Sequence, residues 1–250
     1  MSGVSTFQIR RGADRARTRT EWLDSRHSFA FGSHYDPDNI GFGLLLAHNS
    51  DVLQPGAGYP VHAHRDVEIL TWVMAGSLVH QECGGTATVI PAGQLHHLSA
   101  GSGIRHTEFS ADERPVHVVQ MWLAPDEFGL PPSHRSLPVA ERLAGGGLVR
   151  VASGSADPES PDVLRIRQRA AALSVARLPA GAAVTLPAAR YVHVFLTSGS
   201  ATVQPPDGEP VGTLAAGDAL RITDGGGERL AAEQPAELLV WQMDARRGAS

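Results

Sequence analysis

The sequence contains no lysine, and Cys83 is its only cysteine, so all 21 basic residues are arginine. A single cysteine excludes an internal disulfide, and on that ground we expect a cytosolic protein. Acidic residues outnumber basic ones, which gives a formal net charge of −5 at pH 7. A chain with this balance lacks the basic face of a nucleic-acid-binding protein, so we expect no direct contact with nucleic acid.

Long apolar runs are also missing. No stretch of about 20 apolar residues occurs, and residues 1–22 contain no apolar segment of the kind found in signal peptides. We therefore expect neither a membrane span nor a secretory leader. Apolar residues still make up 42% of the chain, which is enough for a packed core. The 27 glycines and 17 prolines are spread along the sequence, and this spacing predicts many short strands joined by tight turns.

The chain contains an internal repeat, because four segments recur in the same order at nearly one offset. The first copies are LQPG (53–56), WVMAGSLVHQ (72–81), VIPAG (89–93) and PVHVVQMW (115–122). The second copies are LPAG (178–181), FLTSGSATVQ (195–204), GTLAAG (212–217) and PAELLVWQ (235–242). The runs between Gly and Pro predict strands of roughly 4–8 residues. Helical periodicity appears only near residues 138–143 and 162–172.

These features predict an all-β bicupin, in which two double-stranded β-barrel (jelly-roll) domains carry a few short helices. The repeat places the N-terminal domain at residues 1–130 and the C-terminal domain at residues 148–250. Residues 131–147 lie between them, in a stretch rich in Pro, Ser and Gly, and we interpret this segment as a linker.

The N-terminal domain carries a set of metal-ligand residue types at strand spacing. His62 and His64 are two residues apart, and so are His106 and Glu108. Side chains two apart on a strand point to the same face, so two adjacent strands would present three imidazoles and one carboxylate to one pocket. Such a mixed N/O set suits Fe(II), Mn(II), Ni(II), Cu(II) or Zn(II). The sequence therefore predicts one divalent transition metal in this domain.

The second repeat serves as an internal control for this site. Alignment on the glycine turns places residues without a metal-ligand role at the four matching positions, namely Thr185, Pro187, Leu230 and Ala232. We therefore expect the C-terminal domain to be a degenerate, metal-free copy.

Three segments closely resemble pirin and its bacterial relatives. They are WLDSRHSFAFGSHYDPDNIGFG (22–43), HAHRDVEILTWVMAG (62–76) and SAGSGIRHTEF (99–109). The resemblance implies that His62, His64, His106 and Glu108 are the metal ligands, with Fe(II) as the first expectation and Ni, Cu, Mn or Zn open. It also implies two functions, beside which a metal-bound isomerase or hydrolase on the same scaffold stays open, because fold does not fix function. The first is a metal-dependent dioxygenase that cleaves flavonols such as quercetin, with Glu108 as general base. The second is a metal-dependent regulatory protein that acts through protein partners without catalysis.

Two positions near the predicted ligands have open roles. His96 stands where pirin-like proteins usually have glutamine, yet it fits the second cupin motif, whose histidine binds metal. It could be a fifth donor, a competing donor, a group that holds a ligand in place, or a residue at the barrel mouth. Glu68 has the same strand parity as His62 and His64, and we interpret it as support for a ligand, with a role as an alternative ligand left open.

A dioxygenase of this kind needs a small aromatic substrate and dioxygen, and a pocket with flat apolar walls. The candidate wall residues are Phe29, Phe31, Trp72 and Trp122. Ordinary core positions are the alternative for Trp72 and Trp122.

Overall fold

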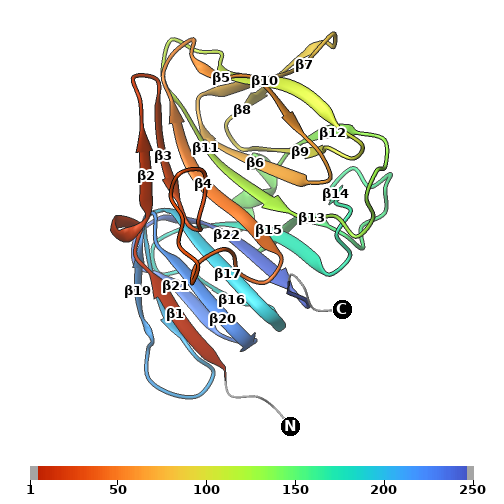
Figure 1. Ribbon diagram of the computed structural model, residues 1–250. Coiled ribbons are helices and arrows are strands. Elements are labelled where there is room, and N and C mark those ends of the chain that lie inside the picture. Colours follow the sequence, from red (N-terminus) through yellow and green to blue (C-terminus); the bar gives the residue numbers. More distant parts are fainter. Residues whose placement is uncertain (1–4, 247–250) are drawn as a thin grey trace.

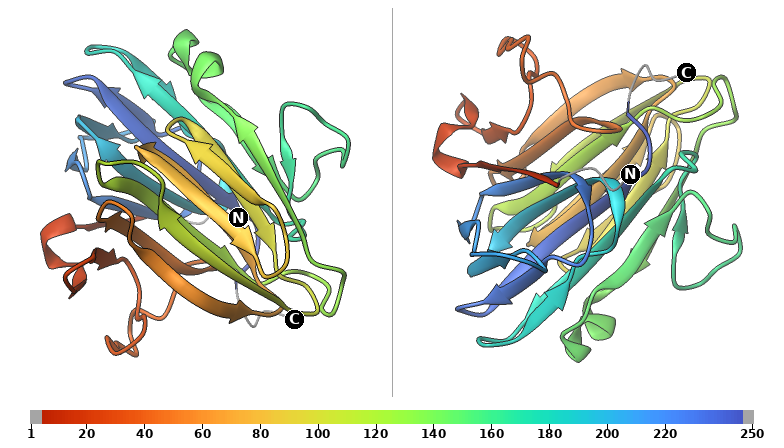
Figure 2. Two further views of the ribbon diagram at one scale, coloured as in Figure 1. Left: turned by 90° about the horizontal axis from the view of Figure 1, so that it is seen from above. Right: turned by 90° about the horizontal axis from the view of Figure 1, so that it is seen from below.

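The computed structural model describes residues 5–246 and contains two β-barrels packed on one another (Figure 1). Each barrel consists of one seven-stranded and one four-stranded sheet. Seen from above and from below, the strands of the two barrels lie in stacked layers (Figure 2). The all-β bicupin prediction is thereby confirmed. The outermost residues of the predicted domains, 1–4 and 247–250, lie outside the described part of the chain.

The N-terminal barrel places the metal-ligand segments in its small sheet. This sheet has the order β5-β10-β7-β8, with β5 (Gly58–His64), β10 (Ile104–Ser110), β7 (Ser77–Glu82) and β8 (Ala87–Pro91). The large sheet has the order β12-β9-β6-β11-β4-β3-β2. Its strands are β12 (Ser133–Pro138), β9 (Gln94–Ser99), β6 (Glu68–Ala75), β11 (Val116–Leu123), β4 (Leu45–Leu53), β3 (Leu23–His27) and β2 (Ala16–Arg19).

The C-terminal barrel repeats this arrangement. Its large sheet runs β1 (Thr6–Arg10), β20 (Ala219–Gly225), β17 (Ala189–Ser198), β22 (Ala236–Met243), β15 (Ala171–Leu178), β13 (Val149–Ser153) and β14 (Leu164–Arg165). Its small sheet runs β16 (Ala183–Thr185), β21 (Arg229–Ala232), β18 (Ser200–Gln204) and β19 (Gly212–Ala215). The same glycine turn joins β6 to β7 and β17 to β18, with Gly76 and Gly199 at φ of 75° and 77°. The internal repeat is thus a structural repeat.

Helices are few and short. The described residues form two 3-10 helices, η1 (Gly12–Asp14) and η2 (Ala140–Gly145). The periodicity at residues 138–143 therefore gives one short helix, whereas the helix predicted at residues 162–172 is wrong, because β14 and the start of β15 occupy that segment. In residues 5–246, no helix has the length and apolarity needed to cross a membrane.

Strand pairing crosses the predicted domain boundaries in two places. β1 pairs with β20, so the N-terminal segment is an edge strand of the C-terminal barrel, drawn in red beside the blue strands in Figure 1. β12, which lies in the segment interpreted as a linker, pairs with β9 of the N-terminal barrel. In both segments the backbone N–H and C=O groups form hydrogen bonds with the edge of a sheet. Amino-acid composition alone does not predict this pairing.

The largest apolar cluster lies between the two large sheets. On β6, Leu70 and Trp72 point into this cluster, whereas Ile69 and Val73 belong to cores inside their own barrel. On β22, Leu239 and Trp241 point into the same cluster, while Leu238 and Val240 point into the C-terminal barrel. These strands are buried on both faces, which explains why they form near-continuous apolar runs in the sequence.

A buried hydrogen bond joins the two barrels within this cluster. The indole N–H of Trp72 donates to Glu237 Oε1 at 2.8 Å, and Trp72 is 0% exposed. Glu237 also accepts from Arg177 at 2.6 Å and from Thr197 at 2.9 Å. Trp72 therefore has a structural role between the barrels.

We expect Trp72→Phe to lower the free energy of unfolding by about 1–3 kcal/mol, because a buried acceptor loses its donor. Chemical denaturation measures this change. Tyr35→Phe is the matched control, since Tyr35 is 80% exposed and its substitution should change the unfolding free energy by less than about 0.5 kcal/mol. Equal effects of the two substitutions would contradict the assigned role of Trp72.

Candidate metal centre

Three of the four predicted ligands come together on the inner face of the small sheet. β5 and β10 are antiparallel neighbours, and their register places His106 directly opposite His62. The ring centroids are 4.3 Å apart for His62 and His106 and 4.8 Å apart for His62 and His64. One ligand nitrogen from each of His62, His64 and His106 lies within 4.8 Å of the other two. We call these three residues the first histidine cluster.

The nitrogens of the first histidine cluster are available to a metal ion. The Nδ1–H of His62 donates to the carbonyl oxygen of Pro60 at 2.8 Å, which leaves Nε2 with its lone pair. The Nε2 atom of His106 is buried and has no hydrogen-bond partner. A buried nitrogen without a partner is destabilising, and a metal ion bound to this atom would supply the missing partner.

The protonation states fit the same conclusion. Burial, assisted by neighbouring histidines, lowers the pKa of His64 to about 4 and that of His106 to about 2. Both imidazoles are therefore neutral near pH 7, which is the form that binds metals. The donor set fits a divalent transition metal.

Glu108 is buried beside this cluster rather than within it. Its carboxylate groups with His106 and His80, while Gln120 Nε2 donates to Glu108 Oε2 at 3.0 Å. The register with β5 shifts between His106 and Glu108, which sets Glu108 opposite Tyr59. Burial raises the pKa of Glu108 to about 7; the hydrogen bond from Gln120 opposes this shift and the charge of Asp51 adds to it. A nearby cation would favour the ionised carboxylate.

A short hydrogen-bond chain orients Glu108. The indole N–H of Trp122 donates to Gln120 Oε1 at 2.9 Å, so the NH₂ group of Gln120 must face Glu108. The Trp122 ring also lies edge-on to His64, with centroids 5.0 Å apart. Trp122 therefore touches one predicted ligand directly and positions another through Gln120, a residue that the sequence did not single out.

The interpretation of Glu68 as support for one of these ligands is not what the geometry shows. The chain turns at Asp66, where φ is 50°, so the strand parity of His62 and His64 does not continue into β6. Glu68 instead lies on the face of β6 that points toward the other barrel. Its Oε2 atom accepts from His97 Nε2 at 2.8 Å and from the backbone N–H of Arg167 at 2.8 Å.

His96 lies inside the barrel, next to the first histidine cluster. Its Nδ1 atom is hydrogen-bonded to Ser136 Oγ at 2.9 Å, and its ring centroid is 4.7 Å from that of His80. His80 in turn is hydrogen-bonded to His106, with the two Nδ1 atoms 3.0 Å apart. No local pattern marks His80 or the nearby His134, because each is a single histidine on its strand. Their contacts arise only from the pairing of sheets.

The four candidate wall residues separate into two pairs. Trp72 lies between the barrels, and Phe29 lies there too, packed beside His193 with ring centroids 6.1 Å apart. Trp72 points away from the barrel interior because it occupies the opposite face of β6. Phe31 and Trp122 contact each other edge-on at 5.4 Å beside His64. Only this second pair is placed to line a pocket at the first histidine cluster.

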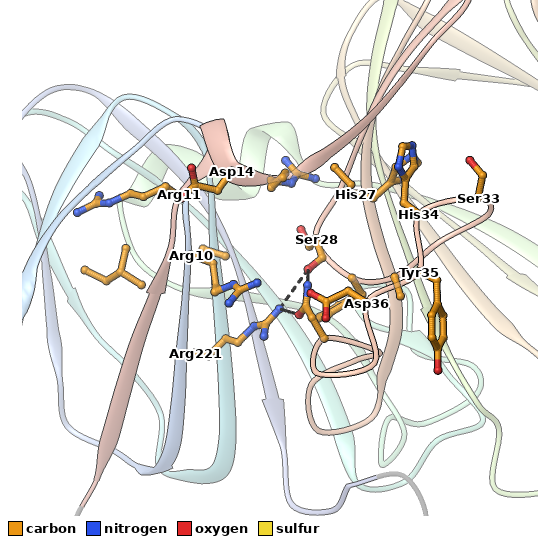
Figure 3. Close-up of a pocket in the computed structure, with 17 residues that line it drawn as sticks. Arg10, Arg11, Asp14, His27, Ser28, Ser33, His34, Tyr35, Asp36 and Arg221 are labelled. Carbon is orange, nitrogen blue, oxygen red and sulfur yellow. Dashed lines mark hydrogen bonds between the residues drawn. The ribbon is translucent and has the colours of Figure 1, made fainter.

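A cavity of about 570 Å³ lies between the barrels (Figure 3). Phe29 is one of its lining residues. Arg221 reaches across this cavity and donates to the Ser28 carbonyl oxygen at 3.1 Å and to Asn39 Oδ1 at 2.7 Å. The lining contains no member of the first histidine cluster. This cavity is therefore separate from the candidate metal centre.

The structural repeat corrects the alignment of the two barrels by two residues. Glu108 pairs with His80 across β10 and β7, and Leu230 pairs with Val203 across β21 and β18. Since His80 and Val203 both lie four residues after the glycine of the shared turn, Leu230 is the counterpart of Glu108. The counterpart of His106 is then Glu228, whose carboxylate caps the backbone N–H of Gly226 at 2.9 and 3.0 Å.

Comparison with known proteins places the chain in a family. A pirin family model matches residues 10–123. The "Putative quercetin 2,3-dioxygenase" of Mycobacterium tuberculosis is 46% identical over 249 residues, which cover 99% of each chain. The chain belongs to the pirin family. The resemblance stated from the sequence is thereby confirmed.

Other pirin-family proteins are similar in sequence and in structure. The crystal structure of the bacterial pirin YhhW from Escherichia coli, in complex with nickel(II), superposes with a TM-score of 0.85 at 30% identity. That alignment covers 96% of this chain and 100% of YhhW. The quercetin 2,3-dioxygenase of Escherichia coli is 41% identical over 128 residues, or 50% of this chain and 55% of that protein.

We expect His62→Ala and His106→Ala to lower the metal content of purified, nickel-reconstituted protein by about one ion per chain, because each removes a ligand from an open site. Elemental analysis after gel filtration measures this. His117→Ala is the control, since His117 is exposed on β11 and should leave metal content unchanged. Unchanged metal content in both cluster variants would contradict the assignment of the ligands.

Gln120→Leu should weaken metal binding by roughly 10–100-fold, because loss of a group that orients a ligand has this effect at comparable sites. Competition with a chelator measures the affinity. Trp122→Phe keeps a ring beside His64 but removes the N–H that orients Gln120, so a smaller decrease is expected. An affinity in Gln120→Leu equal to that of the wild type would show that Glu108 does not depend on this chain of hydrogen bonds.

Proposed function

We propose that this pirin-family chain is a metal-dependent dioxygenase that cleaves flavonols such as quercetin. One divalent metal would be held by His62, His64, His106 and Glu108, with Fe(II) as our first choice and Ni, Cu, Mn or Zn open. The observation that carries the proposal is a group of neutral imidazoles beside a buried carboxyl whose pKa is raised to about 7. The names of the relatives, quercetin 2,3-dioxygenases, support the choice of substrate.

Glu108 would act on the substrate proton. When bound, the metal supplies a positive charge that stabilises a deprotonated substrate hydroxyl. A general base must be ionised to accept a proton, and the charge of a bound cation favours the ionised carboxylate of Glu108 over the neutral form that burial favours. Gln120 Nε2 donates to Oε2, so Oε1 is the oxygen that would face both the metal and the substrate proton.

Phe31 and Trp122 would position the flat rings of the substrate. The two side chains contact each other edge-on, and Trp122 also contacts His64. Aromatic faces favour planar ligands, and their placement beside a ligand would hold the reacting ring close to the metal. A hollow lined by His64, Ile104 and Arg105 adjoins the cluster at His64.

We expect Glu108→Gln to lower kcat for quercetin by at least about 100-fold, because the amide cannot accept the proton. Loss of quercetin absorbance and consumption of dioxygen are measured together, on protein whose metal content is known. His117→Ala is again the control. Turnover that persists in Glu108→Gln at equal metal content would remove Glu108 from the catalytic step.

The alternative function is a regulatory one, in which the metal-bound protein acts through protein partners. Tyr35 and Ile40 support it, since these large apolar side chains are 80% and 54% exposed in the segment between β3 and β4. Large exposed apolar side chains can mark a contact surface. Wild-type protein that holds metal but does not turn over quercetin would favour this alternative. The cytosolic location and the absence of direct nucleic-acid contact stay predictions.

A further inference from the structure

We propose that the N-terminal barrel contains a second site for a divalent transition metal, formed by His80, His96 and His134. These residues come from β7, β9 and β12, and we call them the second histidine cluster. One ligand nitrogen from each lies within 4.8 Å of the other two. The second cluster shares no residue with the first.

Sheet pairing brings the second histidine cluster together. On β12, Ser136 lies opposite His96 and His134 lies opposite Leu98, so His134 and Ser136 share a face of that strand. His80 approaches from the small sheet. The ring centroids are 4.7 Å apart for His80 and His96, 5.3 Å for His80 and His134, and 5.7 Å for His96 and His134.

Each buried imidazole has one nitrogen held by the protein and one without a partner. His96 uses Nδ1 for Ser136, and His80 shares one Nδ1 proton with His106. In the neutral imidazoles only the donor of this proton has a free lone pair on Nε2, so metal binding at both clusters through Nε2 requires loss of the shared proton. The Nε2 atoms of His80 and His96 are buried and have no hydrogen-bond partner. Both residues are almost fully buried, with 0% and 1% exposure. Two such nitrogens close to a third imidazole form a site that a cation would complete.

A carboxylate stands at the open side of the second histidine cluster. Glu82 lies two residues after His80 on β7, and Glu82 Oε1 is 3.6 Å from His134 Nε2. The side chains of Glu82 and His134 are each 33% exposed, so an ion could enter from this side. Three imidazoles and one carboxylate suit a borderline cation such as Zn(II), Co(II) or Ni(II).

The C-terminal barrel shows that the scaffold does not need histidine at these positions. The pairing of β20 with β17 makes Leu220 the counterpart of His96, as the pairing of β21 with β18 makes Val203 the counterpart of His80. Leu220 and Val203 are 0% exposed and belong to the apolar core of that barrel. A barrel of this shape can therefore pack with apolar side chains at these positions. The fold alone does not account for the buried histidine nitrogens without partners in the N-terminal barrel, whereas a bound cation would.

The test uses the double variant His62→Ala, His64→Ala, because the hydrogen bond between His80 and His106 links the two clusters. Metal-free protein is titrated with Co(II), and binding is followed by the visible spectrum and by equilibrium dialysis. We expect the double variant to bind about one Co(II) per chain, and His134→Ala added to it to weaken that binding at least about tenfold. His96→Gln should do the same, and His117→Ala should have no effect.

Two results would overturn the proposal. One is a double variant that binds no Co(II) at concentrations that saturate the wild type. The other is Co(II) binding that survives both His134→Ala and His96→Gln, since the ion would then be held by His80, His106 and Glu108. Far-UV circular dichroism of the metal-free variants checks their fold, and His134→Ala, at an exposed position, decides alone if His96→Gln does not fold. The readout is metal binding, so the result is independent of quercetin turnover.

Discussion

The packing of the two large sheets against each other is the constraint on which the rest of the structure depends. It buries both faces of β6, β11, β17 and β22 and places the largest apolar cluster outside either barrel. The C-terminal barrel adds one large core of its own, whereas the N-terminal barrel has two small ones. Most of the stabilisation from apolar burial thus comes from the interface between the large sheets and from the core of the C-terminal barrel. The interior of the N-terminal barrel can therefore hold many polar groups.

The two barrels show how one scaffold serves two purposes. The positions of Glu108, His80 and His96 correspond to Leu230, Val203 and Leu220, so the same strands close around a polar interior in one copy and an apolar interior in the other. The exception is Glu228, the counterpart of His106, which caps a backbone turn instead of facing other donors. A buried carboxylate that accepts only backbone hydrogen bonds, as Glu228 does, has a structural role. A buried carboxylate beside imidazoles, as Glu108 is, can instead belong to a metal site.

The local spacing of the sequence predicts part of the site and misses the rest for identifiable reasons. Alternation along a strand is a local property, so the spacing of His62 and His64 was sufficient to predict their common face, whereas the place of His106 beside them was an expectation from the family resemblance. The parity of Glu68 failed because the positive φ of Asp66 ends one strand and the next belongs to another sheet. The environments of Trp72 and His134 follow from contacts between sheets. Strand β12 was not predicted, because its segment has the composition of a loop. Such contacts join residues far apart in the chain, which no local pattern encodes.

The electrostatics of the site explain why it suits a cation. Burial disfavours every charged form in the barrel interior, which lowers the pKa of His64 and His106 and raises that of Glu108 toward neutrality. Without an ion, the groups therefore approach a neutral arrangement that avoids isolated buried charges. A divalent cation needs neutral imidazoles, which are already present, and it favours the ionised form of Glu108. Ion entry thus creates the buried carboxylate and its counter-charge together, and the chain from Trp122 through Gln120 already points a donor at the oxygen that gains the charge.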